Sequence, residues 1–285
     1  MFEVHGKRIL VTGASSGLGA ALAVGLAARG ATVGLCGRRA DALDAVLADA
    51  QRHAPDSRSW TQDLADLDGI DAFAARVVDE LGGLDVLINN AGIPKRRWAW
   101  QHRPDEVADV LRINLESPVR LTLALLDALT ANAGHVVFIG SVAARLAPPC
   151  ESVYAASKAG ITAFAEGLAV DLQIAESPVS VHVIQPGVLD TPLFAIPDNE
   201  RSLADIEALP PSAIVEPVIE ALTTGAIETF VPSWFADLPP VKAGDLAGFL
   251  AGSAAYARER IVAEGLVVPV GPGASSAPDP SPASS

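Results

Sequence analysis

Short apolar runs alternate with longer amphipathic stretches along most of the chain, and this alternation narrows the possible folds more than any other feature. The apolar runs have the length of buried strands, and the stretches between them have the length of helices. Strands separated by such helices form right-handed βαβ crossovers. The sequence therefore predicts an α/β fold with a doubly wound, mostly parallel sheet and helices on both faces. The expected strands are Arg8–Thr12, Thr32–Cys36, Ser57–Thr61, Val86–Asn89, Val136–Ile139 and Val179–Ile184, and the expected helices are Gly19–Arg29, Ala40–His53, Ile70–Leu81, Pro104–Thr130 and Ser152–Glu176.

The periodicity breaks between about residues 193 and 240, where prolines recur. We expect a single domain over residues 1–268, in which residues 193–240 form a mobile substrate loop with short helices. Residues 269–285 are rich in Pro and Ser and lack apolar anchors, which predicts a disordered tail.

The overall composition excludes several classes of partner. A formal net charge of −14 would repel nucleic acid. No apolar run reaches the ~20 residues of a membrane helix, and the N-terminus enters a strand pattern without a signal peptide. The two cysteines, Cys36 and Cys150, have no disulfide or metal-ligand spacing. We therefore expect a cytoplasmic protein that acts on a small molecule and binds no metal.

A glycine-rich turn joins the first expected strand to the first expected helix. Gly13 suits a sharp turn off the strand, Gly17 suits close approach of a pyrophosphate, and Gly19 lets the helix pack near the sheet. Free N–H groups at the start of a helix bind phosphate. The turn therefore predicts a dinucleotide site in a Rossmann-like domain, although its Gly-x-x-x-Gly-x-Gly spacing differs from the commoner G-x-G-x-x-G. The expected contacts are Gly13, Ser15, Ser16, Gly17, Leu18 and Gly19.

The same turn also matches the G-x-S-x-G nucleophile elbow of hydrolases through Gly13, Ser15 and Gly17. In that alternative Ser15 is a nucleophile, and His135 or His182 is its base. An elbow serine normally follows several strands rather than the first one. The hydrolase alternative also leaves Gly19 without a role, so we place it last.

Two arginines after the second expected strand bear on the choice of dinucleotide. An NAD site usually carries an acidic residue there to bind the ribose 2′-hydroxyl. This chain has Arg38 and Arg39, whose guanidinium groups suit a 2′-phosphate. We expect NADP as the cofactor, with NAD as the alternative, Arg38 as the main phosphate contact and Arg39 as its support. Asp63 and Leu64, after the third expected strand, are expected at the adenine.

A tyrosine and a lysine four residues apart open the fifth expected helix. At this spacing Tyr154 and Lys158 share one helix face. A nearby ammonium stabilises a phenolate and lowers the tyrosine pKa from about 10. Tyr154 could then exchange a proton with a carbonyl or alcohol oxygen. Ser141, at the end of the preceding strand, would hold the same oxygen.

Taken together, the motifs TGASSGLG, NNAG and YAASK, with Asn114, Ser141, Pro186-Gly187 and Thr191, resemble the short-chain dehydrogenase/reductase family over roughly residues 5–192. The resemblance implies hydride transfer between an alcohol and a carbonyl, with Asn114, Ser141, Tyr154 and Lys158 as catalytic residues. The resemblance also implies that Lys158 binds the nicotinamide ribose and that Asn114 holds a water linked to Lys158. The remaining cofactor contacts that it implies are Asn90, Ala91, Gly92, Tyr154, Pro186, Gly187, Val188 and Thr191. One departure concerns Ser16, where NADP-preferring relatives often carry a basic residue.

The segment after NNAG suggests features of the substrate side. Lys95, Arg96, Arg97 and Arg103 could steer an anionic substrate, or they could form a solvated rim or pair with a neighbouring subunit. Apolar lining could come from the aromatic residues Trp98, Trp100, Phe194, Trp234 and Phe235. We expect a mostly apolar secondary alcohol or ketone.

Other functions on the same fold stay open. One is the reduction of a 3-ketoacyl thioester, and another is a dinucleotide sensor without turnover. A sensor would not need the intact Ser141, Tyr154 and Lys158. The helices Pro104–Thr130 and Ser152–Glu176 carry small and apolar residues on more than one face, which suits a homodimer or homotetramer.

Overall fold

The computed structural model describes residues 2–192, 198–269 and 271. Its strands form one seven-stranded parallel sheet in the order β3-β2-β1-β4-β5-β6-β7. The five central strands, β2, β1, β4, β5 and β6, are short and largely buried runs, as parallel strands covered by helices on both faces must be. The strands are β1 Arg8–Thr12, β2 Thr32–Gly37, β3 Arg58–Thr61, β4 Val86–Asn89, β5 His135–Ile139, β6 Ser180–Pro186 and β7 Glu228–Val231.

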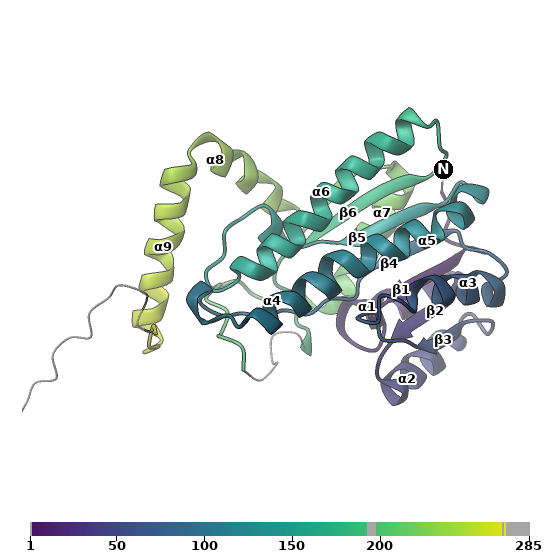
Figure 1. Cartoon of the computed structure of the whole chain (residues 1–285), viewed down its shortest axis with the longest axis horizontal. Helices are drawn as coiled ribbons and strands as arrows, with labels where there is room; N and C mark the ends of the chain where they lie inside the picture. The colour runs from purple at the N-terminus through teal and green to yellow at the C-terminus, as the bar shows by residue number, and fades with distance from the viewer. Residues whose placement is uncertain (1, 193–197, 270, 272–285) are drawn as a thin grey trace, which may run out of the picture.

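Helices cover both faces of this sheet, as Figure 1 shows. Leu22, Leu43 and Val218, from α1, α2 and α7, belong to the apolar core on one face. Phe73, Leu125 and Ile161, from α3, α5 and α6, belong to the core on the other face. The helices are α1 Gly17–Ala27, α2 Ala40–Gln51, α3 Ile70–Leu81, α4 Pro104–Leu111, α5 Ser117–Ala131, α6 Ser152–Ile174, α7 Val215–Thr224, α8 Leu238–Gly244 and α9 Leu246–Ala263.

The predicted α/β architecture is confirmed, and the strand order shows where a ligand site belongs. The first three strands run outward in one direction from β1, and the next four run outward in the other direction from β4. The loops at the carboxyl ends of β1 and β4 therefore diverge and leave a crevice between them. The glycine turn follows β1, and the NNAG segment follows β4.

Two predicted segments differ from the structure. The expected helix Pro104–Thr130 is divided into α4 and α5 by a π-helical turn at Arg112–Glu116. The expected loop 193–240 contains α7 and also β7, which pairs with β6 and forms an edge of the sheet. β7 is only four residues long and carries Glu228 and Thr229, so it lacks the apolar run of the central strands. Of the expected tail, all but residues 269 and 271 lies outside the described residues.

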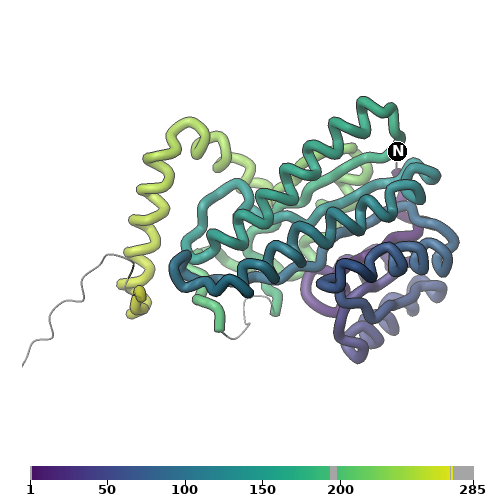
Figure 2. Tube along the Cα trace, viewed as in Figure 1, coloured from purple at the N-terminus to yellow at the C-terminus, as the bar shows by residue number. Residues whose placement is uncertain are grey.

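The last two helices extend beyond the sheet. In the tube of Figure 2, α8 and α9 follow the seventh strand and turn away from the sheet. The helices of the described ranges include none that is long and apolar enough to span a membrane.

Candidate active site

The glycine turn has the backbone conformation that its glycines predict. Gly13 and Gly17 have φ values of +66° and +56°, in the left-handed region that favours glycine. A Cβ on Gly19 would lie 2.3 Å from the carbonyl oxygen of Gly13 and 2.5 Å from Nδ2 of Asn90. Gly19 is therefore required where the start of α1 meets the turn and the NNAG segment.

Hydrogen bonds join the turn to the NNAG segment across the crevice. The Thr12 hydroxyl accepts from the backbone N–H groups of Asn90 and Ala91, each at 3.0 Å. The Asn90 side chain donates to the carbonyl oxygen of Thr12 at 2.8 Å. Thr12 thus fixes the two loops relative to each other, a role that the sequence analysis did not assign. The position of Thr12 at the end of a buried strand was the sequence feature that could have indicated this role.

Arg39, rather than Arg38, contacts the glycine turn in the structure. Its Nη2 donates to Oγ of Ser15 at 3.0 Å and to Oγ of Ser16 at 2.7 Å. Arg38 is exposed at the end of β2. Asp63 and Leu64 follow β3, the strand beside β2, where they were expected. Both arginines therefore lie at the same end of the sheet, and Arg39 brings a positive charge onto the turn.

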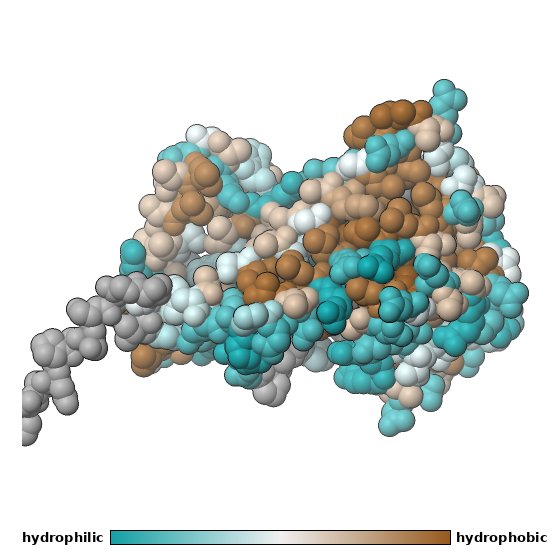
Figure 3. Space-filling view, viewed as in Figure 1, coloured by the Kyte–Doolittle hydropathy of each residue, from teal (hydrophilic) through white to brown (hydrophobic). Residues whose placement is uncertain are grey.

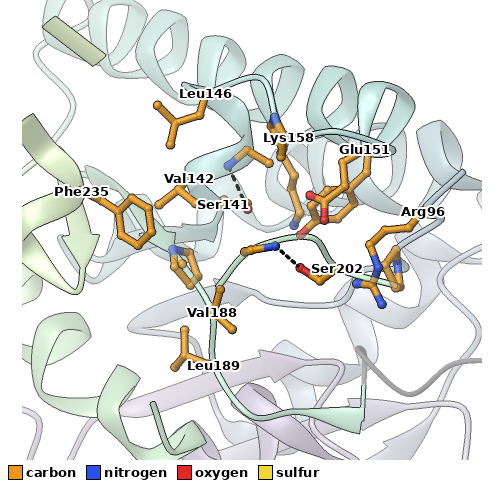
Figure 4. A pocket seen from close by; sticks show the side chains of 18 of the residues that line it. Arg96, Ser141, Val142, Leu146, Glu151, Lys158, Val188, Leu189, Ser202 and Phe235 are labelled. Carbon is orange, nitrogen blue, oxygen red and sulfur yellow. Dashed lines mark hydrogen bonds between the residues drawn. The ribbon is translucent and has the colours of Figure 1, made fainter. Parts of the chain in front are cut away.

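A cavity of about 780 Å³ opens at the carboxyl ends of the strands and contains the expected reaction centre. Ser141, Tyr154 and Lys158 line it together, although they come from the β5–α6 connection and from α6. Figure 4 shows Ser141, Lys158 and Val188 around this cavity. The other predicted cofactor residues that line it are Gly13, Ser16, Gly17, Leu18, Asn90, Ala91, Gly92, Pro186, Gly187 and Thr191.

Asn114 does not line the cavity but lies directly behind it. The residue sits in the π-helical turn and is 1 % exposed. Its amide exchanges hydrogen bonds with the backbone N–H and C=O of Ile93 at 2.8 and 2.9 Å and donates to Ser157 Oγ at 3.1 Å. A Cβ on Gly92 would lie 3.2 Å from Asn114 Oδ1 and 3.5 Å from Lys158 Nζ. Asn114 therefore fixes the wall beside the Lys158 ammonium. The π turn is a local break of the kind often found at functional sites.

The electrostatics of Tyr154 are opposite to the sequence-based expectation. Burial raises its pKa, and the charge of Glu151 raises it further, against smaller lowering effects of the Ser141 hydrogen bond and of Arg96. Burial also lowers the pKa of Lys158 to about 8. Lys158 Nζ lies 5.9 Å from the centroid of the Tyr154 ring and donates to the carbonyl oxygen of Ile139 at 2.8 Å. The expected lowering of the Tyr154 pKa by Lys158 is therefore not found, and desolvation of the phenol dominates that pKa.

The sequence analysis missed Glu151 as a residue of this site and assigned Arg96 only to a charged loop. Both line the cavity, and Figure 4 shows them on the same side of it as Lys158. Burial raises the pKa of the Glu151 carboxyl, and the charge of Arg96 lowers it to a smaller extent. The Arg96 guanidinium also donates to the carbonyl oxygen of Glu200 at 2.9 Å. Its position three residues before the predicted catalytic tyrosine was the sequence signal that could have identified Glu151.

Gln185 is a further polar residue that the sequence analysis did not single out. It is fully buried in β6, and its Oε1 accepts from the backbone N–H of Ser141 at 2.8 Å. Its Nε2 donates to Oγ1 of Thr162 at 3.2 Å and to Glu228 at 2.8 Å. Gln185 therefore positions the backbone that carries the Ser141 hydroxyl.

The other cations of the basic loop are neutralised within the chain. Lys95 and Arg97 each form an ion pair with Glu106 at 3.1 Å, and both pair with Asp198. Arg103 pairs with Glu106 at 3.0 Å. These pairs form within one chain, and they leave little positive charge to attract an anionic substrate.

The expected aromatic lining is correct in part. Trp234 and Phe235 line the cavity, whereas Trp98 and Trp100 stack on each other with centroids 5.4 Å apart and do not line it. Phe194 lies outside the described residues.

The geometry contradicts the hydrolase alternative. His135 and His182 lie on neighbouring strands, and their ring nitrogens are 2.9 Å apart. His182 also contacts the carbonyl oxygen of Ala226 at 2.7 Å. His135 begins β5 and His182 lies within β6, whereas the Ser15 hydroxyl lies beyond the carboxyl end of β1 and accepts from Arg39. Neither histidine is placed to act as a base for Ser15.

Comparison with known proteins assigns the family. The sequence model described as short chain dehydrogenase matches residues 7–201. The chain is 38% identical over 197 residues to dehydrogenase/reductase SDR family member 7B of Bos taurus, which covers 67% of this chain and only 60% of that protein. Identity to the 3-oxoacyl-(acyl-carrier-protein) reductase FabG of Vibrio harveyi is 30% over 216 residues, covering 75% of this chain and 86% of the relative.

A solved structure agrees with this assignment. A short chain dehydrogenase from Burkholderia cenocepacia in complex with NADP is 26% identical, with a TM-score of 0.75 over 88% of this chain and 99% of that one. The chain belongs to the short-chain dehydrogenase/reductase family.

Proposed function

We propose that this protein is an oxidoreductase that interconverts a mostly apolar secondary alcohol and its ketone, with NADP(H) as cofactor. The observation that carries the proposal is that Ser141, Tyr154 and Lys158 line one cavity with the glycine turn. The remaining cavity wall is largely apolar and includes Ile93, Val142, Leu146, Leu189, Leu203 and Phe235. Such a wall favours an apolar substrate.

The residues of the crevice fit a phosphorylated dinucleotide. The left-handed glycines leave the backbone of the turn free of Cβ atoms, so that a pyrophosphate can lie against the N–H groups at the start of α1. Arg39 lies on Ser15 and Ser16 of this turn, and Arg38 follows β2. Two guanidinium groups at this place support NADP over NAD.

The catalytic residues divide the reaction between them. When bound, the nicotinamide supplies or accepts the hydride. The Ser141 hydroxyl holds the substrate oxygen beside Tyr154. Tyr154 donates its proton to that oxygen during ketone reduction and takes it back during alcohol oxidation. Lys158, whose ammonium lies 5.9 Å from the centroid of the Tyr154 ring, would bind the nicotinamide ribose, and Asn114 fixes the wall around that ammonium.

A screen of ketones and aldehydes with NADPH, and with NADH in parallel, tests this proposal. We expect consumption of NADPH with apolar ketones. A 3-ketoacyl thioester belongs in the same panel, because the similarity to the Vibrio harveyi reductase supports that substrate as a second candidate. Tight NADPH binding without turnover of any substrate would instead support the dinucleotide sensor.

Removal of the Glu151 charge is expected to shift the pH dependence of the reaction. The negative charge of Glu151 raises the pKa of Tyr154, so Glu151→Gln lowers that pKa. Oxidation needs the phenolate, and its kcat/KM should therefore rise at lower pH than in the wild type. Reduction needs the protonated phenol, and its kcat/KM should fall at lower pH. Asp171→Asn removes an exposed charge from α6, the helix that carries Tyr154, and should leave both pH profiles unchanged. Unchanged pH profiles for Glu151→Gln would show that the Glu151 charge does not affect the pKa of Tyr154.

We further propose a homodimer or homotetramer in the cytoplasm. Leu123 of α5, and Val170 and Ile174 of α6, are 55%, 56% and 77% exposed. Figure 3 shows apolar residues gathered over these helices, which supports a contact between subunits. Cys36 and Cys150 are buried thiols, which suits a reducing compartment.

A further inference from the structure

The helices α8 and α9 form an arm that begins beyond the family match. The match ends at residue 201, whereas the arm spans Leu238–Ala263. In Figure 1 the arm stands beside the sheet rather than on either of its faces. Within α9 only Ala257 is buried. The arm therefore contributes little to the core of the domain.

One side of this arm lines the cavity. Leu238, Phe249, Gly252, Ser253 and Tyr256 all line it. The spacing from Phe249 to Tyr256 is that of a single helix face. Two other segments line the same cavity, one with Leu146, Ala147, Pro148 and Pro149 after Ser141, and one with Leu203 and Ile206.

Polar contacts anchor the arm beside both of these segments. Ser253 Oγ donates to the carbonyl oxygen of Ala147 at 3.2 Å, and Lys242 Nζ donates to that of Arg145 at 3.0 Å. On the other side, the Tyr256 hydroxyl accepts from the backbone N–H of Asp205 at 2.8 Å. Arg260 pairs with the Asp205 carboxylate, also at 2.8 Å. The arm is thus held as a wall between two segments that border the reaction centre.

The two ends of the cavity differ in chemistry. Ser141, Glu151, Tyr154 and Lys158 give the reacting end its polar groups. The arm contributes carbon surface, and the hydroxyls of its Ser253 and Tyr256 are engaged at the rim. A substrate that fills both ends therefore has a carbonyl or alcohol at one end and an extended apolar group at the other.

We propose that the arm forms the distal wall of the substrate site and selects ketones and alcohols with an extended apolar group. This inference rests on the proposed oxidoreductase function. Burial of each additional methylene against the wall should raise kcat/KM by about fourfold. Within a series of 2-alkanones, turnover should therefore favour 2-octanone strongly over butanone.

Two neighbouring residues of α9 give a matched test. Phe249 lines the cavity, whereas Leu250 is 43% exposed and does not line it. Phe249→Trp should fill the distal end and lower the ratio of kcat/KM for 2-octanone over butanone at least tenfold. Phe249→Ala should lengthen the site and move the preference to longer ketones. Leu250→Trp should keep the wild-type ratio.

Calorimetric binding of the same two ketones separates this proposal from the proposed function. If the wild type binds 2-octanone much more tightly than butanone and Phe249→Trp removes the difference, the wall is supported even without turnover. Absence of all turnover would then overturn only the oxidoreductase assignment. Ratios of kcat/KM and of affinity that stay the same in Phe249→Trp and Phe249→Ala would overturn the wall. The same ratio change in Leu250→Trp as in Phe249→Trp would also overturn it.

Discussion

Tyr154→Phe is expected to lower the rate of ketone reduction by about 10²- to 10⁴-fold, which is the usual contribution of a positioned general acid. The substitution removes only the phenolic hydroxyl, and the ring keeps its place in α6. Ser141 and Lys158 remain in the cavity, but neither replaces the lost proton donor at the same position. The loss should therefore appear in kcat and not in cofactor affinity.

Steady-state rates and NADPH binding together check this expectation. The affinity for NADPH should change by less than about threefold, because the glycine turn and Arg39 do not contact Tyr154. Turnover by Tyr154→Phe at the wild-type rate would remove Tyr154 from the mechanism. Loss of rate together with NADPH affinity would instead indicate a structural role.

The double variant Arg38→Ala/Arg39→Ala is expected to weaken NADPH binding by roughly 100-fold relative to NADH binding. Two guanidinium groups that bind one phosphate contribute charge-assisted hydrogen bonds of about 1.5–3 kcal/mol each, and NADH lacks that phosphate. The structure adds a distinction between the two residues. Arg39 is already held on Ser15 and Ser16, so Arg39→Ala alone should have the larger effect of the two single variants.

Dissociation constants for both dinucleotides check this prediction. Arg52→Ala serves as the control, because Arg52 is an exposed cation at the end of α2 that pairs with Asp49 at 3.0 Å. It should leave both constants unchanged. Equal losses for NADH and NADPH in the double variant would contradict NADP preference.

Much of the fold and part of the site follow from local patterns. The six predicted strands begin and end within two residues of the observed ones, because buried parallel strands need apolar runs. The sequence analysis did not predict β7, because Glu228 and Thr229 interrupt any apolar run there. The break at Asn114 was also missed, because a π turn changes hydrogen bonds without changing the amphipathic pattern.

The electrostatics of the site depended on contacts that no local pattern contains. The basic loop appears cationic in the sequence, but Glu106 and Asp198 neutralise most of it after the chain folds. The pKa of Tyr154 follows burial and Glu151 rather than its spacing to Lys158. The first result depends on ion pairs that form on folding and the second on desolvation, and both are properties of the packed structure.

The sequence by itself determined the alternation of strands and helices, the left-handed glycines of the turn and the shared helix face of Tyr154 and Lys158. Each of these depends on residues that are close together in the chain. Only the tertiary structure decided that Arg39 lies on the turn and that Glu151 and the α8–α9 arm line the same cavity as Tyr154. The arm meets Arg145 and Ala147 across about a hundred residues of chain. Contacts of that range arise only when the sheet brings its strand ends together.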